Sequence, residues 1–186
     1  MRIALTGGIA CGKSLFAKFL RALGVQTLDA DDIVHELIPE EERRRLASIV
    51  FADPAARKAL EARIHPVVRR RFADWFAATG DTQAQTRGGQ PLKVAVIPLL
   101  FECHWDVDYD IILCVSSPAD LQVRRMMETR GMTHAAAIAR LNAQLPVSEK
   151  VARSHFVVVN DSTAEHLCAE ARRCVAWLND AVTRQR

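Results

Sequence analysis

The chain has 186 residues, of which 49% are hydrophobic and 25% charged, and it carries a net charge of +3. This composition is typical of a soluble globular protein with one core, because no run approaches the roughly 18 consecutive apolar residues of a membrane span. With 6% aromatic residues and no recognisable reading motif, it does not favour nucleic-acid binding, and its arginine clusters suit solvated helix faces or small polyanions.

The cysteines and histidines indicate neither disulfides nor a zinc site. Five cysteines are an odd number without a C-x-x-C pair, which is typical of reduced thiols. The six histidines lack the spacing of a zinc motif. Because the sequence starts almost directly on a strand-like segment without a signal-peptide pattern, we expect a cytoplasmic protein, a monomer or weak homo-oligomer, with no membrane partner.

Five short apolar segments predict strands that are buried on both faces, as in a parallel sheet. They are Arg2–Leu5, Val25–Leu28, Lys93–Ile97, Ile111–Val115 and Phe156–Val159. Longer helix-like stretches alternate with them. This order predicts one doubly wound α/β domain over residues 1–186, with a five-stranded parallel sheet flanked by helices.

The helix after the first strand is predicted by apolar residues at helical spacing. They are Leu15, Phe16, Phe19, Leu20 and Leu23, and Gly24 can take the left-handed cap. Residues 40–78 predict further helices, with Pro54 and Pro66 as starts or breaks. The polar stretch 79–91, with its three glycines and final proline, predicts a loop or mobile linker.

A phosphate-binding loop is the strongest chemical signal in the sequence. The stretch Gly7-Gly8-Ile9-Ala10-Cys11-Gly12-Lys13-Ser14 satisfies G-x-x-x-x-G-K-[ST], and it lies between a predicted strand and a predicted helix. Main-chain N–H groups and the helix N-terminus would hold phosphate oxygens, Lys13 would reach the β and γ phosphates, and Ser14 would bind Mg²⁺. The alternative is a glycine-rich turn without a ligand.

Cys11 lies inside this loop. A thiol at a helix N-terminus beside Lys13 is expected to have a depressed pKa, and ATP should then protect it from alkylation. The alternative is that Cys11 is simply a small residue that fits the loop.

The acidic residues that could serve phosphoryl transfer follow the second predicted strand. The motifs of GTPases are absent, and the third and fourth strands run into Pro98 and Ser116 without a carboxylate. Asp29 and Asp31 are instead expected at the carboxyl edge of the sheet, close to the loop. We expect Asp31 to face the acceptor hydroxyl and Asp29 the metal-water shell, although one of these acids can also cap the next helix.

Together, several motifs resemble the dephospho-coenzyme A kinase family over most of the chain. They are Thr6 to Ile9 with Gly12-Lys13-Ser14, Leu23 to Val25, Asp29 to Asp31, His65-Pro66 and Ile97 to Glu102. The resemblance implies a P-loop kinase fold with a helical acceptor-binding region over residues 36–78 and a helical lid over 120–153. It also implies ATP-dependent phosphorylation of the ribose 3′-hydroxyl of dephospho-CoA, with Asp31 as the catalytic aspartate.

The same resemblance assigns further roles to single residues. Catalysis would use Asp31, Lys13 and the lid arginines Arg125 and Arg140, with Gln144 also at a matching place in the lid. The nucleotide would contact Gly7, Gly8, Ile9, Ala10, Cys11, Gly12, Lys13, Ser14, Leu15 and Asn160. The acceptor would contact Asp31, His65, Pro66, Leu99, Leu100, Phe101 and Glu102.

The chain departs from the family pattern at several positions. Ala10-Cys11 replaces Gly-Ser, Thr129 stands where a lid arginine is expected with Arg130 next to it, and His155 replaces the usual acid before the last strand. About twenty-five family residues are missing after Val34-His35. Two alternatives therefore stay open: a kinase of another small metabolite or nucleoside, and a nucleotide-binding module without catalysis.

Overall fold

The computed structural model describes residues 1–43, 45–46, 53–78 and 92–184, which form two compact units. The first unit contains Met1–Thr27 and Asp81–Arg186, and the second contains Leu28–Gly80. The predicted linker over residues 79–91 lies outside the described residues. Across the described part of the chain, no helix combines the length and the apolar character that a bilayer crossing requires.

The chain forms a five-stranded sheet in the order β2-β3-β1-β4-β5. The strands are β1 (Ile3–Gly7), β2 (Gln26–Asp29), β3 (Lys93–Val96), β4 (Ile111–Ser116) and β5 (Phe156–Val159). β1 lies between β3 and β4, with Leu5 opposite Val96 and Leu113, and all three pairings recorded among β1, β3, β4 and β5 are parallel. The predicted parallel sheet is confirmed, and the central position of β1 places its carboxyl end in the middle of the sheet edge.

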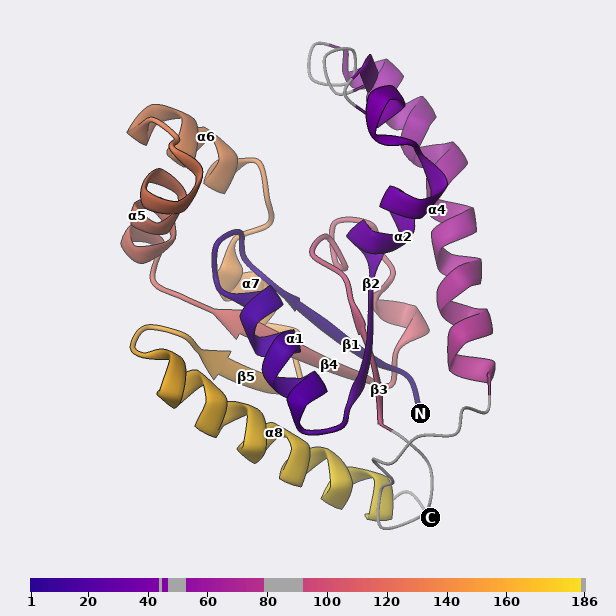
Figure 1. The fold of residues 1–186 in the computed structure, drawn as a ribbon, viewed down its shortest axis with the longest axis vertical. Coiled ribbons are helices and arrows are strands. Elements are labelled where there is room, and N and C mark those ends of the chain that lie inside the picture. Colours follow the sequence, from indigo (N-terminus) through magenta and orange to yellow (C-terminus); the bar gives the residue numbers. More distant parts are fainter. Residues whose placement is uncertain (44, 47–52, 79–91, 185–186) are drawn as a thin grey trace. The chain divides into compact units, whose positions relative to one another are not determined.

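Helices of the first unit follow β1, β4 and β5 along the chain (Figure 1). They are α1 (Lys13–Ala22), α5 (Ala119–Arg130), α6 (His134–Asn142), α7 (Val147–Ala152) and α8 (Ala164–Arg184), with a short turn η1 (Asp106–Asp108). α1 and α8 pack against each other, and both contribute to a core with the strands. α5 and α6 enclose a smaller cluster of Val123, Met126 and Ala137, into which Ile9 inserts.

The predicted face of α1 is largely confirmed. Phe16 and Leu20 are fully buried, and Phe19 and Leu23 pack against the same core. Gly24 has a φ of 86°, the left-handed conformation expected at the end of this helix. Leu15 is the exception, because 38% of its surface stays exposed and it does not extend the buried face.

The second unit contains α2 (Ala30–Leu37) and α4 (Pro54–Ala77), which pack against each other. α4 begins at Pro54, with Asp53 as its N-cap, as the sequence predicts. The expectation of a break at Pro66 is wrong, since α4 continues through it. Pro66 is exposed, so water can bind the helix carbonyl that loses its N–H partner. A 2.7 Å ion pair joins Arg71 of α4 to Glu36 of α2.

Candidate active site

The loop between β1 and α1 has three residues with positive φ: Gly7 at 148°, Ala10 at 56° and Gly12 at 89°. A Cβ on Gly7 would lie 2.1 Å from the carbonyl oxygen of Val115, which belongs to the neighbouring strand β4. Only glycine can occupy that position without moving the sheet. Ala10 adopts the left-handed conformation despite its Cβ, at a conformational cost of roughly 1 kcal/mol.

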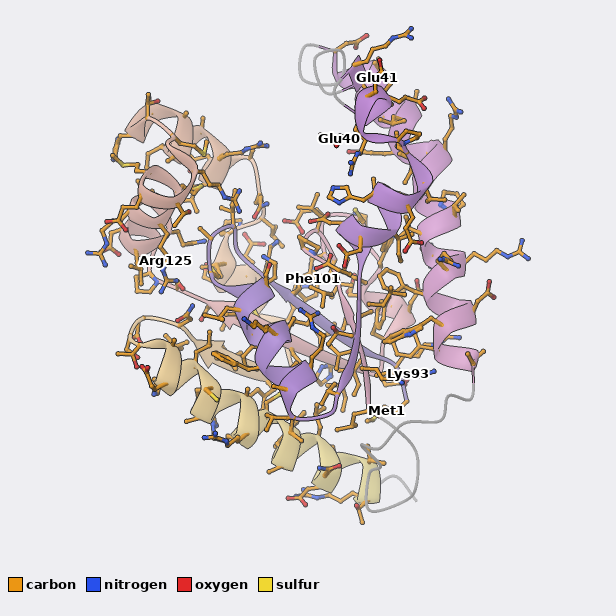
Figure 2. All side chains as sticks on the ribbon, in the orientation of Figure 1. Met1, Glu40, Glu41, Lys93, Phe101 and Arg125 are labelled. Atoms are coloured by element: carbon orange, nitrogen blue, oxygen red, sulfur yellow. The ribbon has the colours of Figure 1, made fainter. Side chains whose placement is uncertain are left out.

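Three consecutive loop carbonyls are held by side chains from distant parts of the first unit. Gln122 Nε2 donates to the Ile9 oxygen at 2.6 Å, and Arg125 Nη1 donates to the Ala10 oxygen at 3.3 Å. Asn160 Nδ2 donates to the Cys11 oxygen at 2.9 Å. Figure 2 shows Arg125 extending from α5, and Gln122 lies one turn earlier on the same helix.

These bonds determine the direction of the loop N–H groups. In a trans peptide unit the N–H points opposite to the C=O, and the structure has no cis bond among its described residues. The N–H groups of Ala10 and Gly12 therefore point away from the side chains that hold the preceding carbonyls. The Ile9 N–H donates to Gln144 Oε1 at 3.1 Å, and the Cys11 N–H makes a long 3.4 Å bond to the Gly8 oxygen. A loop with outward carbonyls presents its remaining amides to an anion.

Positive charge gathers at the same place. Lys13 Nζ donates to the oxygens of Gly7 and Gly8 at 3.0 and 2.8 Å, so the ammonium group lies against the loop. Lys13 is also the first residue of α1, whose N-terminus adds its partial positive charge. Ser14 and Leu15 follow in the first turn with exposed side chains. The arrangement suits a polyphosphate, as the motif predicts.

The side chains that hold the loop are themselves fixed. Ser117 Oγ donates to the Asn160 oxygen at 2.6 Å and accepts from Arg125 Nη1 at 3.0 Å. Asn160 is buried, and its side-chain amide holds the loop through the Cys11 carbonyl. At Thr129, where the family pattern has an arginine, the hydroxyl donates to the Arg125 oxygen at 2.6 Å. Arg130 is exposed in the last turn of α5.

The expectation of a depressed pKa for Cys11 is wrong. Its side chain is completely buried, and burial raises the pKa of the thiol, a shift that the nearby Lys13 ammonium only partly offsets. A buried thiol with a raised pKa carries little thiolate near neutral pH. Cys11 therefore acts as a small packing residue, the alternative that the sequence left open.

The residues from Leu99 to Glu102 differ in exposure. Leu99 is 40% exposed, whereas Leu100 and Phe101 are buried, and the Arg153 guanidinium stacks 4.2 Å from the Phe101 ring centre. Phe101 is labelled in Figure 2. Glu102 forms a 2.7 Å ion pair with Lys150. Within this segment, Leu99 thus has the most accessible side chain for an acceptor.

The remaining predicted residues lie in three places. Arg140 is exposed in the last turn of α6. His65 and Pro66 lie in the middle of α4, in the second unit. Asp29 and Asp31 also belong to the second unit, where they open α2: Asp29 is its N-cap, and its Oδ1 accepts from the Asp31 N–H at 2.9 Å. The Asp31 carboxylate is exposed.

Ser14 and Asp29 offer the kinds of oxygen that Mg²⁺ prefers, a hydroxyl and a carboxylate. No group of three or more His, Cys, Asp or Glu side chains that could hold a metal occurs in the described ranges. Mg²⁺ is usually bound by one or two protein groups together with phosphate and water. Neither residue belongs to a closed metal cage.

Four supporting residues were not predicted from the sequence: Thr6, Ser117, Gln122 and Lys150. Each acts through a partner remote along the chain, and Gln122 and Lys150 occupy helix positions that read as solvent-facing. One signal was present for Thr6, which adjoins the loop motif.

The sheet, its central loop and the helices that follow it define the fold of P-loop kinases, which the chain shares with shikimate kinase from Acinetobacter baumannii (TM-score 0.61, 16% identity, 97% of this chain and 93% of the other). A solved structure from Thermus thermophilus is more similar, with a TM-score of 0.77 and 34% identity over 95% of this chain and 96% of the other. A sequence model described as dephospho-CoA kinase matches residues 1–43 and 40–166. The dephospho-CoA kinase of Anaeromyxobacter dehalogenans is 39% identical over 95% of this chain and 91% of its own length. The chain belongs to the dephospho-CoA kinase family.

The comparison also indicates a shortened region. The alignment with the Anaeromyxobacter enzyme spans 198 positions, but 95% of 186 residues is only about 177, so about 21 positions lack a residue in this chain. The match to the family model restarts at residues 40–43. This agrees with missing family residues soon after Val34-His35.

Proposed function

We propose that this kinase transfers the γ-phosphate of ATP to the ribose 3′-hydroxyl of dephospho-CoA, giving coenzyme A and ADP. The observation that carries the proposal is the phosphate loop, with three carbonyls held outward beside Lys13, in a chain of the dephospho-CoA kinase family. It acts in the cytoplasm, as a monomer or weak homo-oligomer, without a nucleic-acid or membrane partner.

The loop amides and Lys13 bind the triphosphate. Residues 7–15 surround the phosphates, and Asn160 contributes at the nucleotide site by holding the Cys11 carbonyl. Arg125 lies against the Ala10 oxygen and can neutralise charge on the transferred group, and Arg140 adds a second cation from the lid over residues 120–153. Closure of this lid excludes water that would otherwise accept the phosphoryl group.

Asp31 orients the acceptor. The 3′-oxygen forms a bond to the γ-phosphorus while the bond from that phosphorus to the β–γ bridging oxygen breaks, and ADP leaves with the electron pair. The hydroxyl proton passes to the Asp31 carboxylate and then to solvent. The transition state of phosphoryl transfer is loose and needs little proton removal before attack, so a carboxylate suffices as base. The acceptor itself binds through the region 36–78, with His65 and Pro66, and through Leu99 to Glu102.

Ser14 and Asp29 would hold Mg²⁺, Ser14 directly and Asp29 through its water shell. When bound, this ion neutralises charge on the β and γ phosphates. Ser14 lies in the first turn of α1, and Asp29 is the N-cap of α2.

The test is mass analysis of dephospho-CoA after incubation with Mg-ATP and the protein. The product should gain one phosphoryl group, in equal amount to the ADP formed. Lys13→Met is the matched control, and it should reduce turnover by at least about a hundredfold because it removes charge from the transition state. Phosphorylation of another metabolite or nucleoside in a parallel panel, with none of dephospho-CoA, would overturn the proposal, as would nucleotide binding without any transfer.

A further inference from the structure

Lys150 is a fully buried lysine of α7. Its side chain is 0% exposed, and its Nζ lies 2.7 Å from Glu102 Oε1 and 3.0 Å from the Pro98 carbonyl oxygen. A buried ammonium group is costly unless it is paired and hydrogen-bonded. Here it has both kinds of partner, and both belong to the segment that follows β3.

From Glu102, hydrogen bonds continue to the phosphate loop. Glu102 Oε1 also accepts from the Leu145 N–H at 3.1 Å. Gln144, the preceding residue, accepts from the Ile9 N–H at 3.1 Å. Lys150 thus holds the Glu102 carboxylate. This carboxylate in turn holds the backbone N–H of Leu145, the residue after Gln144.

A second route of hydrogen bonds leads from Pro98 to Thr6, just before the start of the phosphate loop. The Pro98 oxygen accepts from Thr6 Oγ1 at 3.3 Å, as well as from Lys150. Thr6 immediately precedes Gly7. The two routes and the backbone from Thr6 to Ile9 therefore form a closed ring, which we call the loop-support ring.

The ring meets the loop at its most constrained residue. The Ile9 side chain packs with Val123, Met126 and Ala137, and its carbonyl accepts from Gln122. Ala10, the next residue, holds a left-handed φ of 56°. Loss of the Gln144 bond would leave the Ile9 N–H without this acceptor and free the peptide units that aim the loop amides.

We propose that Lys150 and Glu102 are positioning residues for ATP binding, acting through Gln144 on the Ile9 N–H. The inference rests on one part of the proposed function, the binding of ATP by this loop. It does not depend on the identity of the acceptor. The second Glu102 oxygen is buried and has no hydrogen-bond partner within the described ranges, so the carboxylate is held through Oε1 alone.

The test separates positioning from stability with four variants: Lys150→Met, Glu102→Leu, their combination, and Gln144→Met. Each single change in the ion pair leaves an uncompensated buried charge and should lower the melting temperature. The double variant replaces the ion pair with apolar groups and should recover most of the lost melting temperature. Its Leu145 N–H still lacks the carboxylate, so its Kd for Mg-ATP should be about three- to tenfold weaker than that of the wild type.

Gln144→Met should weaken the binding of Mg-ATP to the same extent as the double variant does, although it removes no buried charge. Adding it to the double variant should give less than about a twofold further loss, because all three residues act on one bond. In turnover assays of Gln144→Met the KM for ATP should rise with the Kd, while the KM for dephospho-CoA stays constant. A protein that is merely unstable would instead lose kcat with no change in either KM. Glu170→Gln, in the exposed pair with Arg173 on α8, is the control.

Wild-type ATP affinity in either the stable double variant or Gln144→Met would overturn the inference. Because calorimetry of Mg-ATP binding requires no acceptor, this result is independent of whether dephospho-CoA is phosphorylated. Failure of the proposed acceptor would be seen in the wild type alone.

Discussion

The side-chain amide of Asn160 donates a 2.9 Å hydrogen bond to the carbonyl oxygen of Cys11, 149 residues earlier in the chain. The same nitrogen would lie 2.3 Å from a Cβ placed on Gly12. The end of β5 therefore touches the phosphate loop where the loop enters α1. Both the glycine and the amide are required for this close approach.

Asn160→Asp should weaken ATP binding by about tenfold, because a carboxylate cannot donate to the Cys11 oxygen and would repel it. Calorimetric titration with Mg-ATP measures the effect. Asn142→Asp, the same chemical change at an exposed position on α6, is the matched control. Equal affinities for the two variants would show that the amide does not orient the loop.

Ala10→Gly should raise the free energy of unfolding by about 1 kcal/mol, because glycine adopts the φ of 56° without steric cost. Gly131→Ala provides the reverse change at a φ of 62°, where an added Cβ would meet no atom within 4 Å. It should lower the free energy by a similar amount. Denaturant titration measures the free energy of unfolding of both variants. A change of the same sign in the two variants would contradict this explanation.

Alkylation of the native protein should spare Cys11. The half-buried thiols of Cys103 and Cys168 should react with iodoacetamide first, since Cys11, Cys114 and Cys174 are buried. Peptide mass mapping with and without ATP measures the order. Fast labelling of Cys11 that ATP prevents would show that the loop opens far more readily than its hydrogen bonds indicate.

Stability should fall at high pH because of two buried thiols. Burial raises the pKa of Cys114 from 9.0 to about 11 and that of Cys174 to about 12. Above pH 9 the unfolded chain loses these protons while the native protein keeps them, so the free energy of unfolding decreases with pH. The contribution is complete below pH 9 and is lost as the pH rises through 11 to 12. For Cys114 it is on the order of 3 kcal/mol.

Denaturant titrations from pH 8 upward measure this slope. Cys114→Ala will be less stable at every pH because it leaves a cavity, but its stability should decline less steeply. An identical slope in the wild type and in this variant would exclude Cys114 as the titrating group.

Asp31→Asn should reduce kcat by about a hundredfold or more with dephospho-CoA as acceptor, while the Kd for Mg-ATP stays nearly constant. The helix cap survives, because Asp29 accepts from the backbone of residue 31. Asp32→Asn removes an equal charge from the next exposed residue of α2 and should leave kcat close to that of the wild type. Comparable activity of both variants would remove Asp31 from its proposed role.

Most of the sheet could be predicted from the sequence, because its strands are short, apolar and separated by helical periodicity. Phe156–Val159 was predicted to the residue, and β1 was displaced by one residue at its start and two at its end. The continuation of α4 through Pro66 was missed. Local propensity favours a break there, but an exposed proline costs a long packed helix only one internal hydrogen bond.

The phosphate loop could also be predicted, since its motif is contiguous. Its support could not be derived from the local sequence, because Gln122, Gln144 and Asn160 reach the loop only in the folded chain. Gln122 was missed, and Gln144 and Asn160 were placed at the site only by the family resemblance. Nothing in the local pattern distinguishes such polar side chains from solvated ones. The sign of the Cys11 pKa shift was missed for a similar reason: proximity to Lys13 is visible in the sequence, whereas complete burial is not.

Ile9 has its side chain in the α5–α6 cluster and both of its backbone polar groups bonded to glutamines. The loop is therefore held in one conformation before the nucleotide binds. Binding then costs little conformational entropy. Any rearrangement of α5 and α6 must also be transmitted to the main-chain amides of the loop, so movement of the proposed lid would change triphosphate binding.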